Sequence, residues 1–342
     1  MTIEKITRKE LCVGCGTCVG ICPTDAIEMG IDQKGFYLPQ INTEICTNCE
    51  LCERVCPQIN NETNFKELNK FIFGEIPDDK VFGNYINFYI GHSTNENLRF
   101  EASSGGMVTQ LLITALEEEI IDGALVTRMR KDDPLVPEPF IARTKEEIIS
   151  AMGSKYCPVP ANIVLKEIIE SKDDEKFAVV GLPCHLIGIR KAEKLNQKLR
   201  DKIVLHIGLF CTGTKSFFGT DFILEQTKIE KENVRSIKYR GRGWPGYMQI
   251  ENTEGDIKQL FHQHPLYFGA IYPCFANKNC ITCSDHISLL SDISIGDPWG
   301  IEEDPKGNSL LISRTSSGED IIKTAIDYSH VKIKKIKRDA LL

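Results

Sequence analysis

Eight of the 14 cysteines form two copies of one motif near the start of the chain. The first copy, CVGCGTCVGICP, begins at Cys12, and the second, CTNCELCERVCP, begins at Cys46. This spacing is typical of bacterial proteins with two 4Fe-4S clusters, in which the fourth cysteine of each copy binds the cluster held by the other copy. The predicted ligands are Cys12, Cys15, Cys18 and Cys56 for one cluster and Cys46, Cys49, Cys52 and Cys22 for the other.

A zinc site is the alternative interpretation of these cysteines. Structural zinc sites use four ligands in two pairs, often with histidine among them. Here each tetrad ends in Cys-Pro, and no histidine lies nearby. The pattern therefore favours iron–sulfur clusters, and the crossed ligation implies that the two halves fold as one unit.

Four later cysteines predict a third cluster. Cys184 and Cys211 each follow a predicted strand, at 177–180 and 203–209, and Cys280 and Cys283 form a C-x2-C pair. If the two strands are parallel neighbours, both thiols emerge at the sheet edge where α/β proteins bind ligands. Cys274 is a rival ligand. Cys157 stands alone and is expected to be a buried thiol.

Three other segments could contact a cofactor. Ser103, Ser104, Gly105 and Gly106 precede a predicted helix, and a capped helix start with free N–H groups suits a pyrophosphate. An ordinary capped helix is the alternative. Lys155 and Tyr156 offer a cation and a ring, and Arg240 and Arg242 lie among glycines. A surface lysine beside a core tyrosine, and a solvated turn, explain these pairs equally well.

Composition and hydrophobic periodicity indicate what class of protein carries these residues and how its domains are arranged. The chain has 342 residues and a formal net charge of −7, which argues against nucleic acid as a partner. Its first ten residues are polar, and no apolar run reaches the roughly 18 residues of a membrane span. A cytoplasmic protein is expected, with any membrane contact made through a partner. Residues 1–60 are predicted to be a two-cluster domain, 61–95 a linker and 96–342 an α/β domain with parallel strands, in which 238–300 is rich in loops.

Several motifs together resemble the family of coenzyme F420 hydrogenase/dehydrogenase beta subunits, over roughly residues 90–335. They are SSGGMVTQLL at 103–112, GSKY at 153–156, GLPCH at 181–185, CITC at 280–283 and GDPWG at 296–300. The resemblance implies an α+β bacterial ferredoxin-type domain followed by a mixed α/β domain that binds flavin and iron–sulfur. It also implies FAD near Gly105, Gly106, Lys155 and Tyr156, and a third 4Fe-4S cluster on Cys184, Cys211, Cys280 and Cys283.

The resemblance further implies an enzyme that oxidises reduced coenzyme F420. Hydride would pass to FAD, single electrons would pass through three clusters to a redox partner protein, and basic residues near Arg240 and Arg242 would hold the coenzyme. Other members of the family act on different substrates. Two alternatives therefore stay open: a ferredoxin-dependent flavin reductase of an organic compound, and an electron-transfer adaptor without a substrate.

Overall fold

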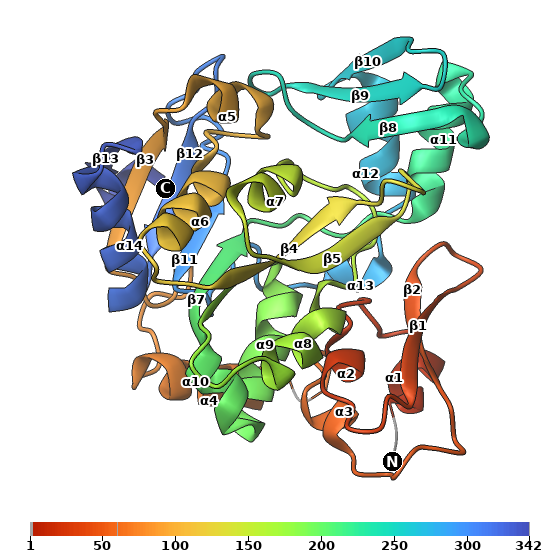
Figure 1. Cartoon of the computed structure of the whole chain (residues 1–342), viewed down its shortest axis with the longest axis vertical. Helices are drawn as coiled ribbons and strands as arrows, with labels where there is room; N and C mark the ends of the chain where they lie inside the picture. Colours follow the sequence, from red (N-terminus) through yellow and green to blue (C-terminus); the bar gives the residue numbers. More distant parts are fainter. Residues whose placement is uncertain (1–2, 60, 342) are drawn as a thin grey trace.

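The computed structural model describes residues 3–59 and 61–341. The N-terminal part (red in Figure 1) contains one two-stranded antiparallel sheet and short helices. Its elements are α1 (Glu4–Arg8), α2 (Thr17–Gly20), β1 (Ile27–Ile31), β2 (Tyr37–Ile41) and α3 (Leu51–Arg54). The duplication seen in the sequence recurs in the backbone. Gly14 and Gly16 have φ of +69° and +80°, and the matching Asn48 and Glu50 have φ of +54° and +62°.

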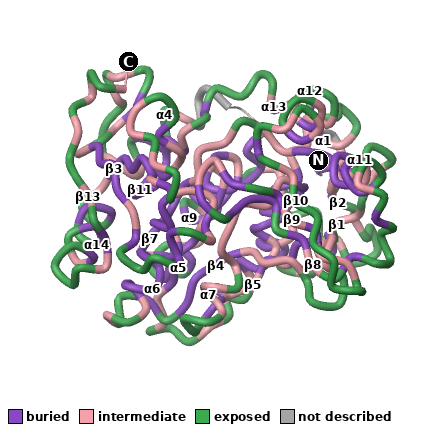
Figure 2. The backbone as a smooth tube through the Cα atoms, turned by 90° about the horizontal axis from the view of Figure 1, so that it is seen from above, coloured by how far each residue is buried: buried purple, intermediate pink, exposed green. Residues whose placement is uncertain are grey.

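An eight-stranded mixed sheet forms the centre of the larger part. Its strand order is β13-β3-β12-β11-β7-β6-β4-β5, and β11, β7, β6 and β4 run parallel. The strands are β3 (Asn87–Ser93), β4 (Gly123–Met129), β5 (Pro137–Ala142), β6 (Phe177–Gly181), β7 (Ile203–Leu209), β11 (Ile293–Gly296), β12 (Ser309–Ser313) and β13 (Val331–Ile336). Figure 2 shows β4, β7 and β11 running through the buried interior.

Helices cover both faces of this sheet. One layer includes α6 (Met107–Glu117), α7 (Lys145–Ser150) and α14 (Ser316–Asp327), and the other includes η1 (Ala161–Val164), α8 (Leu165–Glu170), α9 (Pro183–Leu195) and α10 (Gln197–Lys202). Successive residues of β4 point to opposite layers: Ala124 and Val126 pack with α6, and Leu125 packs with α8 and α9. Two-sided burial explains why these strands are continuously apolar.

A smaller antiparallel sheet and several short helices complete the fold at one end (Figure 1). The sheet has the order β10-β9-β8. The elements are α11 (Phe217–Thr227), η2 (Lys231–Asn233), β8 (Val234–Lys238), β9 (Tyr247–Asn252), β10 (Ile257–Phe261), η3 (Pro265–Ala270), α12 (Ile271–Cys274) and α13 (Lys278–Ile281). The expectation of a loop-rich stretch at 238–300 missed β9 and β10, because their strand signal is short and interrupted by polar residues.

The expected linker contains regular structure. It holds α4 (Asn61–Phe73) and β3, and α5 (Glu96–Glu101) follows. β3 pairs with both β12 and β13, so residues 87–93 belong to the sheet and not to a linker. Their partners lie more than 200 residues later in the chain, and such distant pairing has no local sequence signal.

The last described element is η4 (Arg338–Leu341). None of the described helices is long and apolar enough to cross a membrane.

The N-terminal part packs tightly on the sheet domain through small residues. A Cβ atom on Gly20 would lie 2.1 Å from the carbonyl oxygen of Asn162, and one on Gly188 would lie 2.2 Å from Thr17 Oγ1. The Asn162 backbone N–H donates to the carbonyl of Cys15 at 3.0 Å. Its side-chain amide donates to Thr17 Oγ1 at 2.7 Å and to the carbonyl of His185 at 2.9 Å. Asn162 thus joins α2 to the start of α9.

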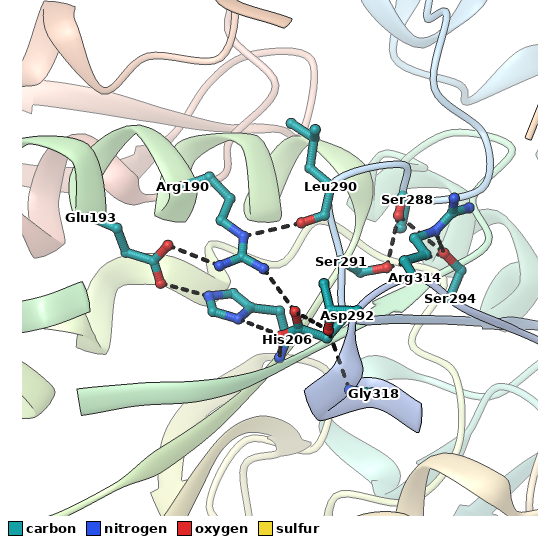
Figure 3. Close-up of polar contacts among 11 residues, drawn as sticks. Arg190, Glu193, His206, Ser288, Leu290, Ser291, Asp292, Ser294, Arg314 and Gly318 are labelled. Atoms are coloured by element: carbon teal, nitrogen blue, oxygen red, sulfur yellow. Dashed lines mark hydrogen bonds and ion pairs between the residues drawn. The ribbon is translucent and has the colours of Figure 1, made fainter. Parts of the chain in front are cut away.

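A buried charge network fixes α9 against β7 (Figure 3). The Arg190 guanidinium contacts Glu193 Oε2 at 3.1 Å and Asp292 Oδ1 at 3.2 Å. His206, on β7, lies between the same carboxylates, with Nε2 2.6 Å from Glu193 and Nδ1 2.9 Å from Asp292. Because both ring nitrogens face carboxylate oxygens, the ring is an imidazolium that donates twice. The two cations and two anions balance, so the network can stay buried.

The titration of this network favours its charged form. Burial and Arg190 lower the pKa of His206, but Glu193 and Asp292 outweigh them and raise it above its ordinary value. Burial raises the pKa of Glu193, whereas His206 and Arg190 outweigh it and lower that pKa. The imidazolium therefore persists to a higher pH than that of an ordinary histidine.

Replacing Gly20 with Ala is expected to lower the free energy of unfolding by about 1–3 kcal/mol, since an added methyl group overpacks the contact with Asn162. Urea unfolding of the reconstituted protein measures this change. Gly269→Ala is the control, because a Cβ there meets no atom within 4 Å. Equal stability of Gly20→Ala and the wild type would contradict the close docking of the two parts.

Replacing His206 with Ala is expected to cost about 3–5 kcal/mol near pH 6, since it leaves two buried carboxylates with one cation. The wild-type contribution of His206 is fully present below the ordinary histidine pKa of about 6.5 and is lost as the pH rises through the raised folded-state pKa. Unfolding free energies measured across pH test this, with His92→Ala as a half-buried control. An identical decline on the alkaline side in wild type and His206→Ala would rule out this role.

Candidate functional site

A cavity of about 800 Å³ opens at the carboxyl ends of the parallel strands. Residues that follow three of these strands line it: Leu182 after β6, Phe210 and Cys211 after β7, and Asp297 after β11. This is the edge at which α/β sheets bind ligands. The cavity volume lies within the range of small-molecule and cofactor sites.

Four cysteines gather beside this cavity. β6 and β7 are parallel neighbours, which was the condition for the third cluster, so Cys184 and Cys211 emerge at one edge. Burial raises the pKa of the Cys184 thiol well above its ordinary value, and the nearby charges of Cys15, Cys211, Cys280 and Cys283 raise it further. Burial, followed by Cys280 and Cys283, likewise raises the pKa of Cys211 to about 11. Thiols that act on one another's pKa lie close together, and four cysteines grouped in this way can supply the thiolate ligands of one 4Fe-4S cluster.

Backbone pairing brings the last two cysteines to the first two. Lys215 forms an antiparallel bridge with Ala276, and the N–H of Ser216 donates to the carbonyl of Phe275 at 2.8 Å. The N–H of Thr214 points to Cys280 Sγ at 3.4 Å. Cys283 and the rival ligand Cys274 are both exposed, so exposure does not separate them. The charges of Cys280 and Cys283 do act on the pKa of both Cys184 and Cys211. The geometry therefore favours the set Cys184, Cys211, Cys280 and Cys283.

The last cysteine of the second N-terminal motif lies with the first three cysteines of the first motif. A small cavity has Cys12, Cys15, Cys18 and Cys56 in its lining, so the second motif does reach the first. Cys22, Cys46 and Cys52 pack in the apolar cluster that surrounds them. Within the described residues, no group of three or more His, Cys, Asp or Glu is arranged to hold a single metal ion. Cluster ligands each bind a different iron, which is a more open arrangement.

The segment 103–106 lies at the cavity but differs from the expected capped helix start. Ser103, Ser104 and Gly106 line the cavity, whereas Gly105 is not among its lining residues. The N-cap residue of α6 is Gly106, without a side-chain cap. Ser104 Oγ donates to the carbonyl of Asn308 at 2.5 Å, and the N–H of Gly105 donates to Ser309 Oγ at 2.9 Å. These bonds anchor the segment to the start of β12 and to the residue before it.

Lys155 and Tyr156 both line the cavity. Lys155 Nζ donates to the carbonyl of Gly153 at 2.9 Å and to that of Ala151, and burial lowers its pKa to about 7. The Tyr156 ring stacks on His262 with centroids 5.9 Å apart. The lysine is thus held by backbone, and the tyrosine belongs to an aromatic wall.

The two arginines predicted to hold a ligand have different surroundings. Arg240 is buried and forms a two-point ion pair with Asp297, at 2.6 and 3.1 Å. Burial lowers its pKa, but Tyr156 and Asp297 outweigh burial and raise it. Arg242 is exposed and is not among the lining residues. Only Arg240 therefore shapes the cavity, and its charge is already balanced.

Sequence reasoning missed two lining residues, His262 and Lys215. His262 is buried, and its Nδ1 has no hydrogen-bond partner in the part of the chain that the structure describes. Its ring lies nearly parallel to that of Trp299, with centroids 6.5 Å apart. Burial, followed by Arg240, lowers the pKa of His262 to about 4. Lys215 is buried, lines the cavity and lies near Cys211 and Cys280. Neither residue lies in a recognisable motif, so no sequence signal pointed to them.

Comparison with known proteins connects these features to one family. Residues 88–166 and 174–339 match the N- and C-terminal models of the coenzyme F420 hydrogenase/dehydrogenase beta subunit, and residues 11–59 match a 4Fe-4S dicluster domain. The coenzyme F420 hydrogenase beta subunit of Methanothermobacter thermautotrophicus is 32% identical over 75% of this chain and 87% of its own. A component of the F420H2 dehydrogenase of Methanosarcina mazei is 26% identical over 93% of this chain and 83% of its own.

A solved structure agrees with this assignment. A chain of the F420-reducing [NiFe] hydrogenase complex from Methanosarcina barkeri has a TM-score of 0.61 and 28% identity, over 77% of this chain and 86% of that one. The resemblance noted in the sequence and the ferredoxin-type N-terminal domain are therefore confirmed. The chain belongs to the family of coenzyme F420 hydrogenase/dehydrogenase beta subunits and carries a 4Fe-4S dicluster domain at its N-terminal end.

Proposed function

We propose that this chain is an electron-input subunit that oxidises reduced coenzyme F420 in the cavity, with hydride transfer to bound FAD, and passes single electrons through three 4Fe-4S clusters to a partner protein. One observation carries the proposal: the four cysteines lie next to the cavity on one side and next to the dicluster domain on the other. Cys211 lines the cavity, and Cys15 of the N-terminal domain lies close enough to Cys184 to raise its pKa. Relatives named for F420-dependent hydrogenases and dehydrogenases support the choice of coenzyme.

The cavity fits FAD in size and in the chemistry of its walls. Its volume of about 800 Å³ is ample for a dinucleotide, and the first residues of α6 line one side. A helix N-terminus attracts a pyrophosphate through its N–H groups and dipole. FAD, when bound, supplies the link between two-electron and one-electron chemistry.

The chain's own residues then orient the ring systems and exclude water. Tyr156, His262 and Trp299 form an aromatic wall that suits flat heterocycles. Arg240 and Asp297 form an ion pair beside these rings, and Trp244 Nε1 also donates a hydrogen bond to Asp297 at 3.0 Å. Arg242, exposed on the same loop, is the cation we assign to the acidic tail of coenzyme F420.

The proposed path of electrons leads from the cavity to the surface. Cys184, Cys211, Cys280 and Cys283 would hold the cluster nearest the cavity. The cluster on Cys12, Cys15, Cys18 and Cys56 comes next, followed by the one on Cys22, Cys46, Cys49 and Cys52. The exposure of Cys49 supports docking of a redox partner beside the last cluster.

Replacing Cys184 with Ala is expected to lower the iron content of the reconstituted protein from about twelve to about eight atoms per chain, since each cluster holds four. Iron and acid-labile sulfide analysis measures this loss. Cys274→Ala is the matched control and should keep all the iron. Unchanged iron in Cys184→Ala, or loss in Cys274→Ala, would contradict the proposed ligand set.

Rapid oxidation of reduced coenzyme F420 is expected when the protein, reconstituted with iron, sulfide and FAD, is mixed anaerobically with the coenzyme and a viologen dye. Absorbance of the oxidised coenzyme and of the reduced dye should rise together. Arg242→Gln should weaken the apparent affinity for the coenzyme more than it changes the maximal rate. No turnover by protein with flavin and iron fully bound would refute the coenzyme assignment and favour the reductase of an organic compound.

A further inference from the structure

Lys215 is a buried lysine in the segment between β7 and α11. Its side chain is 1% exposed, and Nζ finds no acceptor among the described residues. A buried charge is costly unless an opposite charge compensates it. The position is fixed on both sides, because residue 215 bridges Ala276 and the following Ser216 caps α11. The side chain therefore cannot readily turn to solvent.

The groups around Lys215 show where the compensation comes from. Nζ lies 3.9 Å from the centre of the Tyr272 ring and 3.5 Å from the place a Cβ on Gly213 would occupy. A Cβ on Gly213 would lie 2.9 Å from Cys280 Cβ, so the ammonium and this cysteine share one small space. Burial lowers the pKa of Lys215, and the charges of Cys211 and Cys280 oppose that effect. The anions that face Lys215 are thus proposed cluster ligands.

A second lysine shows the contrast. Lys191 also lies near cysteines, since burial lowers its pKa to about 8 while Cys56 and Cys15 act to raise it. Its Nζ, however, donates to the carbonyls of Cys56 and Ile59. Lys191 therefore has a structural task in holding the dicluster domain on α9, whereas Lys215 has no bond of this kind.

We infer that Lys215 tunes the reduction potential of the cluster on Cys184, Cys211, Cys280 and Cys283. Reduction adds one negative charge to that cluster, and a fixed ammonium beside it stabilises the reduced form. Net charge near the sulfurs is one of the main determinants of cluster potential. Because Lys215 also lines the cavity, its charge favours electron transfer from the cavity into this cluster. The inference rests on the third cluster of the proposed function.

A redox titration of the full-length reconstituted protein, followed by EPR, tests this inference without coenzyme F420. Lys215→Met should make one cluster about tenfold harder to reduce, a negative shift of about 59 mV for one electron. The other clusters should keep their potentials. Lys215→Gln, which is also neutral, should give the same shift, and Lys215→Arg, which keeps the charge, should restore the wild-type value. Lys306→Met is the control, since that lysine is exposed and paired with Glu96.

Three results would overturn the inference. In the first, no potential moves in either neutral variant. In the second, the loss of about four irons from both neutral variants shows that Lys215 assembles the cluster instead of tuning it. In the third, the neutral variants bind FAD more weakly while the cluster potentials stay unchanged, which shows that Lys215 contacts the flavin instead. The cluster potentials can be measured even if the protein does not oxidise reduced coenzyme F420. The two proposals can therefore be refuted independently.

Discussion

The parallel pairing of β6 with β7 is the constraint on which the site depends. It brings the residues that follow both strands to one edge, and the buried network of Arg190, Glu193, His206 and Asp292 holds α9 in register with β7. The start of α9 carries one proposed cluster ligand and the loop after β7 carries another. A shift of either element would separate them, so a charge-balanced network whose residues do not line the cavity helps to set the geometry of the cysteines.

The second constraint is the close docking of the dicluster domain. Gly20 and Gly188 allow backbones to approach, and Asn162 bonds both the domain and α9. The same α9 thus positions a cysteine beside the cavity at its start and receives the N-terminal domain along its length. Cofactor order along the proposed electron path follows from this packing, because the domain has little freedom to adopt another orientation on the sheet.

Much of this architecture could be predicted from local patterns, and the remainder depends on distant contacts. The repeated cysteine spacing predicted the dicluster domain, and the apolar runs before Cys184 and Cys211 predicted two strands. Their parallel pairing, on which the shared edge depends, was a condition that only the structure could decide. β3 could not be assigned, because its partners lie more than 200 residues away. The pairing of Arg240 with Asp297 and the burial of His262 and Lys215 arise only when separate loops meet. Arg242 lies two positions after Arg240 in the sequence, yet only Arg240, which is buried, lines the cavity.

The most direct test of the account is whether electrons reach the dicluster domain only through the cluster beside the cavity. Rapid-freeze EPR can follow cluster reduction after reduced coenzyme F420 is mixed with wild-type protein and with Cys184→Ala, both loaded with FAD. The account predicts that the N-terminal clusters become reduced within the turnover time in the wild type and stay oxidised in the variant while the flavin is bleached. Reduction of those clusters at the wild-type rate in Cys184→Ala would contradict it.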